Sequence, residues 1–284
     1  MEYFAQGLET PECPILLPDG DLLCVEMRRA SVTRIDATSR EARVVKRTGG
    51  FPNGLVREAS GRLWIGEVQE RALILIDAEG AELDRITSCG AERFRWPNDL
   101  AIGPDGALYV TDSGLVLSEA SGADWSTVAI DGCVYRVDRQ SREVRRLDRG
   151  LRFTNGLAFG PDRMLYVAET ISGNIYRYDV LGGPMPEREL FGNVFGPEKP
   201  GGMVGPDGMK FGTDGRLYCT VFGQGRIVVF DPAGAVVGEI RTAGSSPTNL
   251  AFSEDGSRKI YVTELSVGAI ETHPAPCDGL PLFR

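Results

Sequence analysis

One phrase recurs six times along the chain and limits the folds that it can adopt. Each copy opens with a polar residue and a short apolar stretch, turns at Asp-Gly or an equivalent pair, and continues into a β-prone stretch that in most copies ends in an acid. A repeat of this kind sets the whole architecture. The six lead residues are Glu12, Asn53, Asn98, Asn155, Asp207 and Asn249, at intervals of 41 to 57 residues.

Each copy predicts a β-hairpin, because Asp and Gly tolerate the backbone angles of tight turns. A third, apolar strand and a fourth, more charged strand follow most copies. Third strands are expected at residues 72–77, 133–138, 174–179 and 226–231, and fourth strands at 143–147 and 235–240. Four strands per unit of about 40–50 residues form the blade of a β-propeller. We therefore predict an all-β, six-bladed propeller with four antiparallel strands per blade, filling residues 1–284 as a single domain.

The sixth unit lacks a fourth strand of its own. Its third strand is expected at residues 269–273, and only a Pro-rich tail follows. The N-terminal segment 1–8 has strand character but belongs to no unit, so we expect it to close the last blade. His273 would then lie on a strand away from the axis, as a structural residue. Two long insertions, at residues 112–132 and 192–206, are expected to be functional loops.

Composition excludes several classes of function. The net charge of −9, without a basic block, makes nucleic acid an unfavourable partner. The only histidine is His273, which argues against a histidine-based zinc hydrolase or a Ser-His-Asp triad. Six scattered cysteines are expected to be buried thiols. With no apolar run of membrane-spanning length and no secretion-type start, we expect a cytoplasmic protein with no membrane partner.

The lead residues predict a site for a hard cation. The innermost strands of a propeller run in the same direction beside the axis, so the six lead residues are expected to form one ring at one channel mouth. All six side chains carry carboxylate or amide oxygen, which suits Ca²⁺ or Mg²⁺. Two buried carboxylates, Glu12 and Asp207, would repel each other without a cation or protons. The alternative is that Asn53-Gly54 and Asn155-Gly156 are repeated turn dipeptides.

Four of these motifs resemble the senescence marker protein (regucalcin)/gluconolactonase family. They are ETPECP around Glu12, WPNDLAIGPDGALYVTD around Asn98, TNGLAFGPDRMLYVAE around Asn155, and GPDGMKFGTDGRLYCTV around Asp207. The motifs are similar to those of diisopropylfluorophosphatase, a related six-bladed propeller, as is PTNLAF around Asn249. The resemblance implies a lactonase with one divalent ion, Ca²⁺ first and Mg²⁺, Mn²⁺ or Zn²⁺ as alternatives. It implies Glu12, Asn155 and Asp207 as metal ligands, Asn98 as a ligand or substrate contact, and Asp207 as the catalytic base or nucleophile.

The chain departs from the family at two positions. Sugar lactonases of the family carry an Arg two residues before the motif Asn, where this chain has Trp96, preceded by Arg95. We expect the substrate to contact Asn98 and four further residues, Trp96, Arg95, Asn53 and Asn249. A Trp at this position favours a flatter or less hydroxylated lactone. The alternative role for Trp96 is packing under the long loop. Ala251 stands where phosphotriesterase relatives have a His.

The predicted activity is opening of a lactone to a hydroxy acid, with the cation as Lewis acid. Two alternatives remain open at this level. A phosphotriesterase could use the same ring of oxygens, because a metal that polarises C=O also polarises P=O. A non-catalytic propeller would bind a protein partner and would carry an exposed apolar patch rather than a polar channel mouth.

Overall fold

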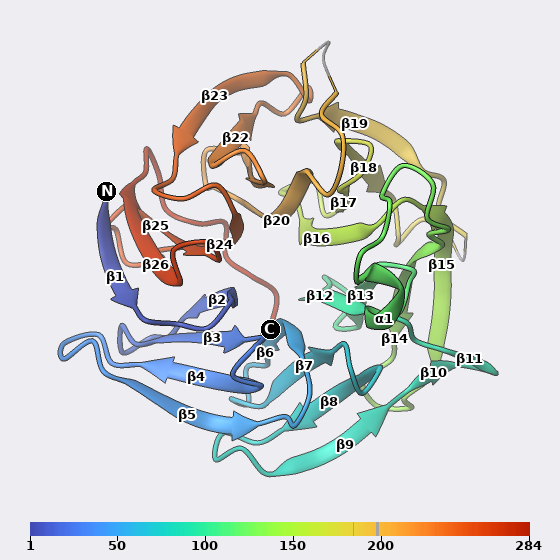
Figure 1. Cartoon of the computed structure of the whole chain (residues 1–284), viewed down its shortest axis with the longest axis horizontal. Helices are drawn as coiled ribbons and strands as arrows, with labels where there is room; N and C mark the ends of the chain where they lie inside the picture. Colours follow the sequence, from blue (N-terminus) through green and yellow to red (C-terminus); the bar gives the residue numbers. More distant parts are fainter. Residues whose placement is uncertain (184, 197–198) are drawn as a thin grey trace.

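The computed structural model describes residues 1–183, 185–196 and 199–284 and is a ring of six four-stranded antiparallel sheets around a central axis (Figure 1). The predicted all-β, six-bladed propeller is confirmed. In the described residues, helix is limited to the short α1 (Leu117–Ala120), and a small hairpin pairs β10 (Ser88–Cys89) with β11 (Glu92–Arg93). The loop at residues 192–206 is described except for residues 197 and 198, which lie outside the described part.

The strands follow the repeat. Blade one contains β2 (Pro11–Leu16), β3 (Leu22–Glu26), β4 (Ser31–Ile35) and β5 (Ala42–Arg47), and blade two β6 (Pro52–Arg57), β7 (Leu63–Glu67), β8 (Ala72–Ile76) and β9 (Glu82–Ile86). Blade three contains β12 (Pro97–Ile102), β13 (Leu108–Asp112), β14 (Gly132–Val137) and β15 (Val144–Leu151). Blade four contains β16 (Thr154–Phe159), β17 (Leu165–Glu169), β18 (Asn174–Tyr178) and β19 (Glu189–Asn193). Blade five contains β20 (Gly205–Phe211), β21 (Leu217–Phe222), β22 (Arg226–Phe230) and β23 (Val236–Arg241).

Blade six is closed by the start of the chain, as predicted. It contains β24 (Pro247–Phe252), β25 (Lys259–Glu264) and β26 (Ala269–Pro274), and β1 (Glu2–Gln6) pairs antiparallel with β26 (Figure 1). His273 is buried on β26, with its Nε2 2.8 Å from Oε2 of Glu271, and has the structural position expected for it. All six cysteines, which lie in the described residues, are free thiols, and five of them are buried.

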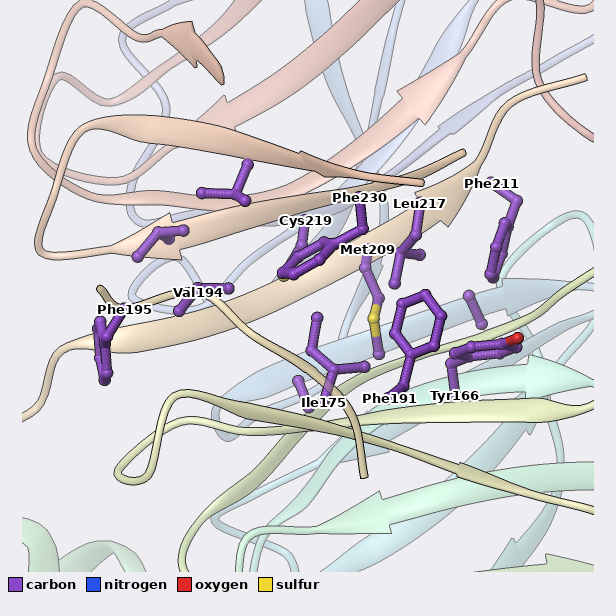
Figure 2. Packing of buried hydrophobic residues seen from close by; sticks show 14 residues of the cluster. Tyr166, Ile175, Phe191, Val194, Phe195, Met209, Phe211, Leu217, Cys219 and Phe230 are labelled. Carbon is purple, nitrogen blue, oxygen red and sulfur yellow. The ribbon is translucent and has the colours of Figure 1, made fainter. Parts of the chain in front are cut away.

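The core lies between neighbouring blades. Figure 2 shows one such interface, where Tyr166 and Phe191 of blade four meet Met209, Phe211 and Phe230 of blade five. The ring of Tyr166 packs edge-on against both Phe191 and Phe211, with centroids 4.9 Å apart in each pair. Burying a large apolar side chain contributes about 1.5–3 kcal/mol. Blade-to-blade packing therefore holds the inner strands rigidly around the axis.

Every inner strand has an irregular register beside its lead residue. In β12, Asn98 and Asp99 lie between the pairs Pro97–Asp112 and Leu100–Val110, so two residues face one on the partner strand. The register shifts at the corresponding place in the other five inner strands. Bulges of this kind redirect side chains and are frequent next to active sites. Here they direct successive side chains toward the channel.

The register corrects one part of the sequence prediction. In β24, Leu250 pairs with Val262 as Leu100 pairs with Val110, so Asn249 is the equivalent of Asp99 and Thr248 is the lead residue of blade six. The sequence alignment was one residue off because the hairpin turn of this blade is longer than the others. Thr248 donates its hydroxyl to the carbonyl of Pro11, 3.0 Å away, in blade one.

The Asn-Gly pairs are not turns, which removes the alternative explanation for their repetition. Gly54 and Gly156 lie inside β6 and β16. A Cβ on Gly54 would lie 2.2 Å from the carbonyl oxygen of Asn98, and one on Gly156 would lie 2.1 Å from that of Asp207. Glycine is required because the inner strand of the next blade passes at this distance.

Gly156→Ala is expected to lower the free energy of unfolding by about 1–3 kcal/mol, as overpacking does in other cores. The added methyl would force β16 away from β20, the strand that carries Asp207. Gly238→Ala on the exposed strand β23 is the matched control, because its Cβ would meet nothing closer than 3.9 Å. Urea unfolding of both variants checks the prediction, and equal stability of the two would contradict it.

Candidate metal centre

Five lead residues lie buried around the axis at the end of the channel where the inner strands begin, which we call the front. They are Glu12, Asn53, Asn98, Asn155 and Asp207, all between 3% and 6% exposed. The charge of Glu12 is one of the causes that raise the pKa of Asp207, so the two carboxylates face the same space. The sixth residue named from the sequence, Asn249, lies one layer deeper for the reason given above.

The amide groups of Asn98 and Asn155 are oriented by hydroxyl groups. Asn98 Nδ2 lies 3.0 Å from Ser113 Oγ, and Ser113 donates its own proton to the carbonyl of Thr154. Asn155 Nδ2 lies 3.2 Å from Thr170 Oγ1, which donates to the carbonyl of Pro206. A hydroxyl whose proton is already used can only accept, so each amide must present its nitrogen to the hydroxyl. This leaves both amide oxygens for a ligand in the channel.

Burial disfavours the ionised form of two carboxylates among the lead residues. Burial raises the pKa of Glu12 to about 8, with the negative charge of Asp99 as the next cause. Burial also raises the pKa of Asp207 well above its usual range, with further contributions from Glu12 and Asp99. A carboxylate in such a place is either protonated or compensated by a cation. The ring therefore lacks positive charge that a divalent ion would supply.

The donor set fits a hard divalent cation. Carboxylate oxygens of Glu12 and Asp207 and amide oxygens of Asn98 and Asn155 are the ligand types that Ca²⁺ and Mg²⁺ take. In the described part of the chain no three His, Cys, Asp or Glu side chains are grouped as metal ligands. The candidate centre differs from such a group because amides supply two of its four donors.

Asp99 is a buried residue next to Asn98 in one of the four motifs, and it was not among the predicted site residues. Its Oδ1 accepts from Leu100 N at 2.8 Å and from Cys13 Sγ at 3.3 Å, and its Oδ2 from Leu157 N at 3.4 Å and Asn249 Nδ2 at 3.3 Å. Asp99 occupies the position after the lead residue, where three other copies have glycine. This departure from the repeat is the sequence feature from which Asp99 could have been predicted as a site residue. Ser113 and Thr170, each directly after the acid that ends a hairpin, were missed in the same way.

The substrate-contact candidates divide into two groups. Trp96 is half-buried and donates from Nε1 to Asn53 Oδ1 at 2.9 Å, so both residues lie at the front of the channel. Its ring packs edge-on against Phe153, with centroids 5.7 Å apart, and Trp125 of the long loop packs on the other side of Phe153 at 5.8 Å. The exposed side chain of Arg95 donates instead to the carbonyl of Gly114, at 3.2 Å, within that loop. Asn249 faces Asp99 and Cys13 in the deeper layer.

The acids that end five hairpins stabilise the approach to the ring. Asp112 accepts hydrogen bonds from the backbone N–H groups of Arg95 and Trp96, and Glu26 from that of Glu9. Glu67, Glu169 and Glu264 accept in the same way from the loops before their own inner strands. Each of these acids is thus a strand-end partner for the backbone. They fix the loops from which the lead residues follow.

The fold and this centre define a six-bladed propeller with an oxygen-lined site on its axis. The chain belongs to the SMP-30/gluconolactonase/LRE-like family, whose model matches residues 10–266. The resemblance drawn from the four motifs is therefore confirmed.

Several named relatives of this chain are lactonases. A gluconolactonase of Zymomonas mobilis is 27% identical over 96% of this chain and 81% of its own length, and a lactonase drp35 of Staphylococcus saprophyticus is 25% identical over 86% and 73%. The structure of a gluconolactonase from Xanthomonas campestris superimposes with a TM-score of 0.78 at 25% identity, covering 96% of this chain and 89% of that one. Regucalcin of Agrobacterium tumefaciens, described as a calcium-binding protein, shares the fold with a TM-score of 0.76 at 18% identity over 99% of this chain and 96% of that one.

Among the described residues, no helix has the length and hydrophobicity needed to cross a bilayer.

Proposed function

We propose that the protein is a divalent-cation-dependent lactonase that opens a cyclic ester to a hydroxy acid. The observation that carries the proposal is a pair of buried carboxylates with raised pKa values, together with two amides oriented by hydroxyl groups, on the inner strands of four blades. The names of the relatives, gluconolactonase and lactonase, support the reaction class, and the calcium-binding neighbour supports the cation. Ca²⁺ is the first candidate, because oxygen ligands and a carboxylate pair are its usual environment.

Each residue of the centre has a distinct role in this proposal. Glu12, Asn155, Asp207 and Asn98 would hold the cation, which when bound supplies Lewis-acid polarisation of the lactone carbonyl. Asp207, whose pKa burial raises, is the base that accepts a proton from the attacking water. Water adds to the carbonyl carbon, the ring C–O bond breaks, and the leaving oxygen takes a proton to give the hydroxyl of the product. Ser113 and Thr170 keep the two amide oxygens directed inward.

The wall of the front mouth bears on the class of lactone. Trp96, Phe153 and Trp125 pack together, with Leu115 and Ile171 completing an apolar cluster. The two arginines beside this wall donate to loop carbonyls, Arg95 to that of Gly114 and Arg152 to that of Trp125. A flat apolar surface favours aromatic or alkyl-substituted lactones over polyhydroxylated sugar lactones.

A lactone panel measured by proton release tests the proposal. The purified protein, stripped with a chelator and then reloaded with Ca²⁺, Mg²⁺, Mn²⁺ or Zn²⁺, is offered gluconolactone, an alkyl γ-lactone and dihydrocoumarin, with a phosphotriester in parallel. We expect no turnover without cation, restoration by Ca²⁺, and a higher kcat/KM for dihydrocoumarin than for gluconolactone. Equal lactone turnover in the stripped protein, or turnover of the phosphotriester alone, contradicts the proposal.

A further inference from the structure

Behind the ring, the channel contains a cavity that the proposed lactonase reaction does not use. It has a volume of about 100 Å³, is partly open to solvent, and is lined by the inner strands and by residues 279–284. Figure 1 shows the C-terminus inside the ring of blades. Leu280 donates its N–H to the carbonyl of Phe211, and Phe283 packs edge-on against Phe159 with centroids 6.0 Å apart. Since one water needs about 10–15 Å³ on this measure, the cavity has room for several waters or a short acyl chain.

The lining is mostly apolar, but it also contains the cations Lys210, Arg57 and Arg284 and the carboxylates Asp99 and Glu254. Lys210 lies in β20 opposite Tyr218 of the partner strand. The same register position in the other five blades is occupied by small or branched apolar residues. They are Ile15, Val56, Ala101, Ala158 and Ala251. A lysine on the apolar wall of a channel costs free energy unless something satisfies its charge.

Nothing in the described residues pairs with this charge at ion-pair distance. The Nζ of Lys210 donates to the carbonyl of Met209 at 3.1 Å and to Asn249 Oδ1 at 3.4 Å, and it forms no salt bridge with the described carboxylates. The charge of Lys210 acts through space on Glu12, where it opposes the rise in pKa, and Asp99 lines the same cavity. Both oxygens of Asp99 already accept two hydrogen bonds each from other donors. The ammonium of Lys210 thus keeps donor capacity directed at the cavity.

The back mouth adds a second unpaired cation. Arg57, at the end of β6, lines the cavity and forms no salt bridge with a described residue. Arg284 also lines it but is paired with Glu254, 3.0 Å away. The back of the channel therefore has unpaired positive charge in a protein whose net charge is −9. Such a patch selects anions.

We propose that this cavity binds an amphipathic monocarboxylate, with its carboxylate on Lys210 and its short alkyl chain against the apolar wall. The carboxylate would supply the missing partner of the ammonium, and the chain would bury apolar surface between Val56, Ala101 and Phe159. Arg57 would attract the anion to the mouth. The site is separate from the front centre and does not depend on the lactonase proposal.

Isothermal titration calorimetry with octanoate tests the site on the whole chain in the presence of a chelator. We expect saturable binding of octanoate and at least tenfold weaker binding of 1-octanol, which has the chain without the charge. Lys210→Met should weaken octanoate binding at least tenfold. Lys259→Met, at an exposed position of β25, is the matched control and should bind as the wild type does.

A second variant keeps the test decisive if the lysine variant does not fold. Ala101→Leu fills the cavity without changing charge, and it should also weaken octanoate at least tenfold. No binding to the wild type at millimolar octanoate, equal binding of octanol, or unchanged binding in a folded Lys210→Met or Ala101→Leu variant would overturn the proposal. So would binding that requires added Ca²⁺ and disappears in Glu12→Gln, because that result places the anion at the front centre.

Discussion

Asp207→Asn is expected to lower kcat/KM for lactone hydrolysis about a thousandfold, the middle of the range for loss of a general base. Asparagine keeps the shape of the side chain and one ligand oxygen, but it cannot take a proton from water at neutral pH. Burial raises the pKa of Asp207 in the cation-free protein, and a bound cation would favour the ionised carboxylate that can take the proton. Kinetics at saturating Ca²⁺ separate this effect from weaker cation binding, which titration calorimetry measures independently.

Two further variants define what that result means. Glu12→Gln should weaken cation binding, yet it should recover more activity at saturating Ca²⁺ than Asp207→Asn does, because Glu12 has no proton to move in the proposal. Asp214→Asn is the matched control in the hairpin turn of the same blade, where the carboxylate accepts from Arg216 N and Tyr218 OH. A folded Asp207→Asn protein with wild-type kcat at full cation occupancy would exclude Asp207 as the base.

In the cation-free protein, the free energy of unfolding is expected to fall as the pH rises from about 5 to about 8. The pKa of Glu12 is about 8 in the folded state, against an ordinary value of 4.5. The folded state then binds more protons than the unfolded state in this interval, so stability is highest at the acid end and is lost as Glu12 ionises. One such group gives a slope of about 1.4 kcal/mol per pH unit, and the raised pKa of Asp207 acts in the same direction.

Urea unfolding at four pH values, with chelator and with saturating Ca²⁺, measures this slope. The decline should be shallower in Glu12→Gln, because that variant has one titrating group fewer. Saturating Ca²⁺ should remove the decline, since the cation compensates the ionised carboxylates in the folded state only. If the free energy of unfolding without cation stays constant or rises over this interval, the pKa values of Glu12 and Asp207 are not raised in the folded state.

The architecture was predictable because each blade repeats the same local code. An apolar stretch, an Asp-Gly turn and a second apolar stretch specify a hairpin wherever they occur, and six copies specify the ring. The closing strand was predictable from the one strand-like segment without a unit. The register of blade six was not predictable, because residues 253–258 form a longer connection than in the other blades. Counting positions along the sequence does not reveal which strand residues pair.

The candidate centre was predictable only where its residues follow the repeat. Glu12, Asn98, Asn155 and Asp207 occupy equivalent positions, so one argument places them all. Four other residues of the channel depart from the repeat in their own copies, namely Asp99, Lys210, Ser113 and Thr170. Their importance depends on contacts between blades, such as that of Asp99 with Cys13 and Asn249. Such contacts follow from three-dimensional packing and have no counterpart in local spacing.

The pairing of β1 with β26 affects how the polypeptide is made. β1 is translated before the strands of the six blades, and its partner β26 is translated after nearly all of them. Until then β1 is an unpaired edge, and blade six is missing beside blades one and five. Blades one to five can form during synthesis, but the ring can close only after β26 has been translated. A truncated product would therefore expose unpaired sheet edges, which promote aggregation.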